Sequence, residues 1–421
     1  MQINLRSADR KLFCIGGAFL LAAVYLALVS REFLAAHFAS VPEIASLRSA
    51  VRMEPMNAEY HQRLARYFFL ADHDVTSALA AYESAVRLNP YDANLWLGLA
   101  SVQQVLGNPV EQEKALERAI VANPRSTNVA WEAANLYLAR GETDKAFREF
   151  RTVIENSPLD ADAALRLCLR VAPSVDTIIQ EALPSQPGAY VILLDLLTAK
   201  NDTAGAAKVW AGLVQMNKPF EERYAFEYIK YLLSQRQVEP AQLAWRQTTN
   251  LFGLPGYQSS ADNLIVNPNF DFKILNQGFD WQYTKQPGVT LALDPADFHA
   301  GRRSLSISFE GPGVNDAGVF QVIPVRPDTS YEFSAFFKSA EIQGAGGPRF
   351  AFQDAYTNTT LLLSDELKNA GVWREAGGGF KTDPETKLIA LRILRVPAGN
   401  AIRGKLWVGD FRLIEKKKQP S

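Results

Sequence analysis

The sequence predicts a multidomain chain in which a transmembrane helix is followed by an all-α solenoid and then by an all-β antiparallel sandwich. Three observations predict this order. An uncharged apolar run lies near the N-terminus, prolines then recur at a fixed interval, and polar and apolar residues alternate over the last third. Each pattern has the period of a different structure, so the chain is expected to fold as separate domains.

The composition is that of a folded protein without a bulk electrostatic preference. Of 421 residues, 48% are hydrophobic and 21% are charged, and the net charge is −1. Long disordered segments are not expected at such values. A net charge near zero gives no general attraction to nucleic acid, so nucleic acid is not an expected partner. Cys14 and Cys168 fall in different predicted segments, which predicts neither a disulfide framework nor a cysteine metal site.

An apolar run from Leu12 to Val29 is long enough to cross a membrane. As a helix, these uncharged residues would span about 27 Å, close to the thickness of bilayer hydrocarbon. Basic residues precede the run, and the positive-inside rule therefore favours a cytoplasmic N-terminus. We predict a cytoplasmic segment 1–11 and a transmembrane helix 12–30. The protein would be a single-pass protein of the inner (plasma) membrane, with its bulk periplasmic or extracellular.

Two alternatives for this run stay open. A cleaved signal peptide needs small residues at positions −3 and −1 of the cleavage site. Cleavage after Ala36 or Ala39 would place Leu34 or His37 at −3, and neither is small. A buried helix of a soluble domain is rarely apolar on all sides. An uncleaved membrane anchor therefore fits these residues best.

A ladder of prolines follows, at Pro55, Pro90, Pro124 and Pro158, spaced 35, 34 and 34 residues apart. A fixed period with a proline closing each unit is typical of stacked helical hairpins. Proline prevents the second helix of a hairpin from continuing, while small residues let helices approach closely and aromatic residues fill the gaps between hairpins. The ladder therefore predicts a helical solenoid.

When the units are aligned on their prolines, other residue types also recur at fixed positions. The third unit shows these positions best, at Tyr137, Gly141, Ala146, Phe150 and Pro158. With residues of these types at these positions, the segment from Glu43 to Pro158 resembles the tetratricopeptide repeat (TPR) family. Beyond it, Pro173 is expected to interrupt a first helix, and about six hairpins are expected to end near Phe252. We predict TPR-like helical repeats over 43–252, regular to about 158 and divergent after.

The TPR resemblance implies a concave groove that binds a protein partner as a peptide or a helix. Polar residues of the first helices are the candidates for contacting such a partner. A solvated helix face is the alternative interpretation of each. The candidate groove residues are Asn94, Gln103, Asn128, Asn135 and Arg166.

Glycine, proline and serine gather in 253–262 and mark a linker. After it the residues alternate with period two, for example over 304–309 and 331–337, where serines or charged residues face one side and hydrophobic residues the other. Short alternating segments between turn residues predict an antiparallel β-sandwich. We assign the sandwich to 263–415 and a solvated tail to 416–421.

Several segments of this region follow one another in the same order as similar segments of a known class of β-sandwich. Asn263 to Asp271 would be the opening strand, followed by Gly278–Trp281, His299–Leu305 and Leu406–Leu413. In these segments the region resembles jelly-roll carbohydrate-binding modules of the galactose-binding-like class. The resemblance implies the fold more than sugar binding, because these motif residues are mostly structural.

The same resemblance implies one cofactor, a structural calcium ion. Its acidic ligands in the class correspond here to Asp271 and Asp410, although Gly409 stands where a further carboxylate is expected. Calcium prefers six to eight oxygen ligands, so backbone carbonyls would have to complete the site. No other cofactor is predicted.

A glycan site would need an exposed aromatic ring flanked by polar groups. Trp281, Trp373 and Trp407 lie in motif positions that favour the core. Strand parity instead places Phe336 on the face that carries Glu332 and Lys338. The candidate glycan-binding residues are Tyr283, Phe336, Arg349, Gln353, Tyr356 and Asn358.

No motif predicts catalysis. The four histidines are not spaced as a metal pair, no glycine-rich loop precedes a helix as a phosphate site requires, and no carboxylate pair stands out. We therefore expect no enzyme but a membrane-anchored extracytoplasmic scaffold or adaptor that binds protein partners through its repeats. Cell-envelope or exopolysaccharide assembly is the expected setting. One alternative is a carbohydrate-binding protein in which the sandwich binds polysaccharide and the repeats are a spacer. A further alternative is an enzyme whose site in the sandwich no motif reveals.

Overall fold

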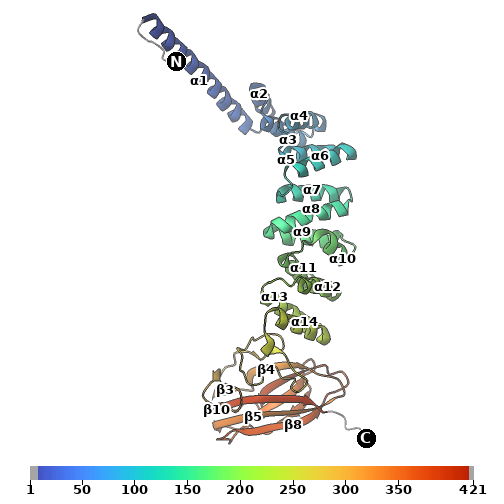
Figure 1. The fold of residues 1–421 in the computed structure, drawn as a ribbon, viewed down its shortest axis with the longest axis vertical. Coiled ribbons are helices and arrows are strands. Elements are labelled where there is room, and N and C mark those ends of the chain that lie inside the picture. Colours follow the sequence, from blue (N-terminus) through green and yellow to red (C-terminus); the bar gives the residue numbers. More distant parts are fainter. Residues whose placement is uncertain (1–7, 417–421) are drawn as a thin grey trace. The chain divides into compact units, whose positions relative to one another are not determined.

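The computed structural model describes residues 8–416, and the chain divides into two compact units, of which one ends at Leu193 and the other begins at Leu194. Helices α1 to α14 come first and strands β1 to β10 follow (Figure 1). The predicted order of apolar helix, helical array and antiparallel sandwich is confirmed. Residues 1–7 of the predicted cytoplasmic segment and 417–421 of the predicted tail lie outside the described residues.

Helix α1 (Ala8–Ser40) extends well beyond the predicted span. It continues as one helix past Val29, and its most apolar 18-residue window has a mean hydropathy of 2.5 and is 0% buried. The last turns are different, because Ala35 and Ala39 are buried against Ala50 of α2 and Tyr60 of α3. The helix that is long and apolar enough to cross a membrane is therefore also the first helix of the array.

The other helices of the first unit are α2 (Ile44–Met53), α3 (Ala58–Leu70), α4 (Val75–Leu88), α5 (Ala93–Val105), α6 (Pro109–Ala122), α7 (Thr127–Ala139), α8 (Thr143–Asn156), α9 (Pro158–Val171) and α10 (Val175–Thr177). Helix α11 (Pro187–Ala199) crosses the boundary between the units. The second unit continues with α12 (Thr203–Gln215), α13 (Glu222–Ser234) and α14 (Val238–Leu251).

Each repeating proline lies just after the end of one helix, and a capping residue soon after the proline marks the start of the next helix. Helices α4, α6 and α8 each end two residues before their proline, as predicted. Two residues after the first three prolines, Asn57, Asp92 and Ser126 accept hydrogen bonds from backbone N–H groups of α3, α5 and α7, at 3.0, 2.9 and 3.3 Å. These side chains satisfy N–H groups that the first turn of a helix leaves free.

The fourth repeat departs from the pattern in its second helix. Helix α9 is complete, so the predicted interruption of a first helix by Pro173 is wrong. The proline follows the end of α9, and it disfavours helical backbone at Ala172. In place of a long second helix the chain forms α10 and a five-residue π-helical turn, Ile178–Ala182. Pro184 then prevents further helix.

The sandwich consists of two five-stranded antiparallel sheets, ordered β1-β4-β9-β6-β7 and β2-β3-β10-β5-β8. Between them lies an aromatic core in which Phe333, Phe350 and Phe411 meet mostly edge to face. The strands are β1 (Gln282–Tyr283), β2 (Val289–Asp294), β3 (Ser304–Gly311), β4 (Asp316–Pro324), β5 (Ser330–Gln343), β6 (Pro348–Asp354), β7 (Thr360–Leu363), β8 (Arg374–Lys381), β9 (Leu388–Arg395) and β10 (Ile402–Glu415).

Two details differ from the sequence expectation. The predicted opening strand Asn263–Asp271 is irregular, because the Asn263 side chain donates to the Phe411 carbonyl at 2.8 Å and accepts from the Leu413 N–H at 3.1 Å. Side-chain bonds thus replace a regular ladder there. In β3, Ser304 and Ser306 face away from the core yet are buried, and Ser304 donates to the backbone carbonyl of Asp297. The β2–β3 loop therefore covers this face.

Candidate functional site

The candidate groove residues have different surroundings. Asn94 and Asn128 are exposed at equivalent positions of α5 and α7, and Arg166 is exposed on α9, where it pairs with Asp162 at 2.6 Å. Gln103 is only 6% exposed and accepts a hydrogen bond from Asn108, and half-buried Asn135 donates to a carbonyl of its own helix. Asn94, Asn128 and Arg166 are therefore the groove candidates that a partner can reach.

A charged cluster fixes consecutive hairpins to each other. Glu113 of α6 accepts from Arg140 at 2.9 Å and from Lys145 at 2.7 Å, both from the following hairpin. The hydroxyl of Tyr137 donates to the same carboxylate, and burial, together with this nearby negative charge, raises the pKa of Tyr137. The contacts restrain motion between these hairpins.

The structure does not bring the six candidate glycan residues together. Tyr283 lies on β1, at the edge of the first sheet, and is 47% exposed. Arg349 and Gln353 point outward from β6 of the same sheet, with β4 and β9 in between. Phe336 points outward from β5 of the other sheet.

The remaining two candidates, Tyr356 and Asn358, lie in the β6–β7 turn. The Tyr356 hydroxyl donates to the Leu233 carbonyl of α13 at 2.9 Å, and the Arg236 guanidinium lies 5.0 Å from the centre of its ring. Burial raises the pKa of Tyr356. Asn358 is exposed at a backbone φ of 60°, where asparagine is favoured among non-glycine residues. Tyr356 thus joins the last hairpin to the sandwich.

Two of the three tryptophans assigned to the core are not there. Trp281 is 1% exposed, as predicted. Trp373 and Trp407 are half-buried on the outer side of the second sheet, where their indole N–H groups donate to Asp297 at 3.2 Å and Asp294 at 2.8 Å. Trp407 points outward because its neighbours in β10 point into the core, and the alternation of this strand could have shown it.

Beside these tryptophans, Phe336 is covered by a histidine. The ring of His299 stacks on Phe336, with 3.6 Å between the ring centres and 7° between the planes, and its Nδ1 lies 3.0 Å from a carboxylate oxygen of Asp410. Phe336 is therefore not an open platform for a sugar ring.

The outer face of the first sheet carries a better arrangement, which the sequence reasoning missed. Phe320 of β4 lies opposite Arg392 of β9, whose guanidinium is 5.2 Å from the centre of the ring. Asp316 accepts from Arg392 at 3.0 Å, and Ala351 is the next residue across the sheet. Phe320 is thus a half-buried ring with a fixed cation over it and a small side chain nearby, a combination of apolar and polar groups that small-molecule sites use.

The predicted calcium ligands are held by protein donors. Asp271 accepts from the Arg302 N–H at 2.7 Å with its carboxylate and from the Arg303 guanidinium at 2.6 Å with its backbone carbonyl. Asp410 pairs with His299. Within residues 8–416, no three His, Cys, Asp or Glu side chains gather to hold a metal ion. The predicted site has only two carboxylates and depends on backbone carbonyls for its remaining ligands, so the calcium site stays a prediction.

No protein-family profile matches the chain, and no curated protein matches it. Among solved structures, one entitled "CBM4 structure and function" is 13% identical, covers 36% of this chain and 99% of its own, and has a TM-score of 0.29. The crystal structure of YrrB, described as a TPR protein with an unusual peptide-binding site, is 13% identical, with coverages of 50% and 93% and a TM-score of 0.26. The crystal structure of MamA is 18% identical, with coverages of 41% and 85% and a TM-score of 0.26. These scores are too low to assign fold or function.

Proposed function

We propose that the chain is a membrane-anchored scaffold whose helical repeats bind a protein partner outside the cytoplasm. The observation that supports it most is the continuity of α1 with the array. Its apolar residues from Leu12 to Val29 have no protein cover, whereas Ala35 and Ala39 at its other end are buried in the first hairpins. Apolar surface left in water is costly, and a bilayer is the environment that suits a helix of this length.

The hairpins from α3 to α8 suit a scaffold because they are fixed to each other. The Glu113 cluster ties consecutive hairpins, and the packing of Tyr82 on Gly98 does the same one hairpin earlier. Such an array presents polar residues of its first helices at a constant spacing, which favours a peptide or a helix as the ligand. Nothing in this arrangement supports chemistry, so we infer a binding role and no catalysis.

The same proposal places the protein in cell-envelope or exopolysaccharide assembly at the inner membrane. The apolar helix would anchor it, the repeats would hold a protein component, and the sandwich would contact polysaccharide. Deleting the gene and measuring the amount and the chain length of the surface polymer tests this setting. Polymer of unchanged amount and length would contradict it and leave the scaffold role itself standing.

Site-specific crosslinking tests the scaffold role. A photoreactive amino acid at Asn94 or Asn128 is expected to capture the same protein in living cells, because the two positions are equivalent in consecutive hairpins. The matched control is Arg118, exposed on the second helix α6. Equal capture from all three positions, or none from the first two, would contradict a partner in the groove.

Carbohydrate binding is a second candidate function, supported by Phe320 and Arg392 on the first sheet. Phe320→Ala is then expected to abolish retardation of the protein in gels that contain the polysaccharide, because stacking on the ring is lost. Leu363→Ala, on the edge strand of the same sheet and 39% exposed, is the control and should migrate like the unmodified protein. Equal retardation of all three proteins would contradict a glycan site at Phe320.

A further inference from the structure

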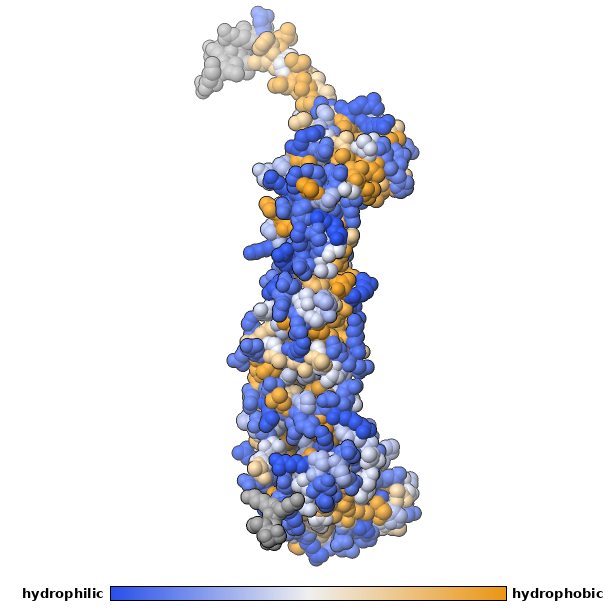
Figure 2. Space-filling model, turned by 90° about the vertical axis from the view of Figure 1, so that its right-hand side faces the viewer, coloured by the Kyte–Doolittle hydropathy of each residue, from blue (hydrophilic) through white to orange (hydrophobic). Residues whose placement is uncertain are grey.

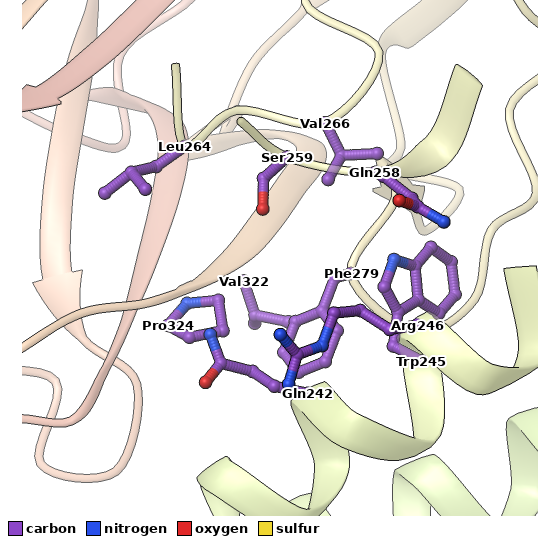
Figure 3. A pocket seen from close by; sticks show the side chains of 10 residues that line it. All are labelled: Gln242, Trp245, Arg246, Gln258, Ser259, Leu264, Val266, Phe279, Val322 and Pro324. Carbon is purple, nitrogen blue, oxygen red and sulfur yellow. The ribbon is translucent and has the colours of Figure 1, made fainter. Parts of the chain in front are cut away.

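A cavity of about 190 Å³ lies between α14 and the sandwich, inside the unit that begins at Leu194. Gln242 and Arg246 of α14 line it together with Val322, Pro324 and Phe279 of the sandwich (Figure 3). An apolar cavity of about 150 Å³ is enough for a benzene molecule, so this one has room for a group of that size.

The walls are held in place by contacts of the lining residues Trp245 and Phe279 and by an ion pair between α14 and the sandwich. The indole N–H of Trp245 donates to the Tyr257 carbonyl at 2.8 Å, and the Trp245 ring meets Phe279 edge to face at 5.9 Å. Lys387 of the sandwich pairs with Glu239 of α14 at 3.0 Å. Because the hairpin and the sandwich are fixed to each other here, the cavity is formed before any ligand arrives.

The polar side of the cavity opens to solvent, because Arg246 and Ser259 are exposed and Gln242 is half-buried. In the part of the chain that the structure describes, no carboxylate lies within 4.0 Å of the Arg246 side chain, although the protein has many ion pairs elsewhere. The side chains of Gln242 and Ser259 make no hydrogen bond to the protein in that same part. These three side chains offer a guanidinium, an amide and a hydroxyl to one small space (Figure 3).

We propose that this cavity binds an organic carboxylate whose apolar body is about the size of a leucine side chain. Arg246 pairs with the carboxylate, since a guanidinium matches its two oxygens with parallel N–H groups. Gln242 and Ser259 donate further hydrogen bonds, and the apolar body packs on Val322, Pro324 and Phe279. The C-terminal residue of a peptide and a free carboxylic acid share this chemistry. The site is separate from the groove, and it lies on the same outer face of the first sheet as Phe320, because Phe320, Val322 and Pro324 alternate with buried residues of β4.

Ligand binding to the full chain in detergent micelles tests the proposal. The probes are N-acetyl-leucine, 4-methylpentanoate and the neutral N-acetyl-leucinamide, measured by calorimetry and ligand-observed NMR. Both acids are expected to bind with dissociation constants below about 10 mM, and the amide at least about tenfold more weakly, because it lacks the charge. Binding of N-acetyl-leucine alone would assign the site to a peptide C-terminus. Equal binding of both acids would show that a free acid suffices.

Two variants localise the binding. Arg246→Gln should weaken both acids at least about tenfold, whereas Arg326→Gln, an exposed arginine of the sandwich paired with Glu415, should leave them unchanged. Val322→Phe should block the acids by filling the cavity, with an unchanged circular dichroism spectrum as the check of folding. The proposal is overturned if neither acid binds saturably, if the amide binds as well as the acids, or if Arg246→Gln binds like the unmodified protein.

Discussion

Asp280 is a buried carboxyl group that should make the sandwich less stable at neutral pH than at acid pH. It is 0% exposed, its Oδ2 accepts from the Leu275 N–H at 2.7 Å, and its Oδ1 makes no hydrogen bond. Removal from water disfavours the charged form and raises the pKa of Asp280 to about 6. Asp280→Asn removes the charge and keeps the acceptor for Leu275.

The size of the effect follows from the pKa. A rise of about two units corresponds to about 3 kcal/mol of lost stability once the folded protein must ionise the group. Since the pKa is higher in the folded state, the stabilisation by the proton is complete below about pH 4, declines between about pH 4 and 6, and is absent above. Burying the side-chain amide N–H groups of the new asparagine without a hydrogen-bond acceptor costs about 1 kcal/mol. Asp280→Asn should therefore stabilise the sandwich by about 2 kcal/mol above pH 6.

Urea denaturation with hydrogen-exchange mass spectrometry measures this for the sandwich alone. Peptides from β5, β6 and β10 report its free energy of unfolding at about pH 7.5 and at about pH 4. The variant should be more stable than the unmodified protein at the higher pH and equal or less stable at the lower pH. A variant that is less stable at about pH 7.5, or one with the same pH dependence as the unmodified protein, would refute the reasoning.

Three further substitutions test packing. Gly98→Ala should lower the free energy of unfolding of the array by about 1–3 kcal/mol, because a Cβ there would overlap the Tyr82 ring. The loss should be smaller in a protein that also carries Tyr82→Leu, and thermal denaturation measures both effects. Arg395→Met should destabilise the sandwich by about 3 kcal/mol or more in urea, since its buried guanidinium donates to four backbone carbonyls that would lose their donors. Tyr356→Phe removes the bond to Leu233 and should speed hydrogen exchange at the end of α13 by about fivefold, with exchange in α9 as the control.

The helical array could be predicted in detail because its signals are local. The prolines and the capping residues two positions later lie next to the helix ends that they determine. The sequence does not predict the continuity of α1 with the array, because the charged residues Arg31 and Glu32 directly follow the apolar run and its predicted end at residue 30. Only packing against other helices shows that Ala35 and Ala39, one turn apart, form a buried stripe.

The sites were harder to predict because they depend on distant residues. The sequence predicts Tyr356 as a glycan contact, yet its partner is Leu233, which is 123 positions away in the sequence. The sequence does not predict that Phe320 points outward, because its neighbour Gln321 is polar yet points inward, where it bonds to the Val266 backbone. The pairing of Phe320 with Arg392 depends on the register between β4 and β9.

Cysteine labelling tests the central claim most directly, namely that α1 anchors the chain with the repeats and sandwich outside the cytoplasm. Lys381, on β8 of the sandwich, has a side chain that is 61% exposed and suits replacement by cysteine after Cys14 and Cys168 are changed to alanine. The account predicts that Lys381→Cys reacts fully with a membrane-impermeant maleimide in intact spheroplasts and stays with the membrane after alkaline extraction. Reaction only after lysis, or release of the protein by extraction, would contradict it.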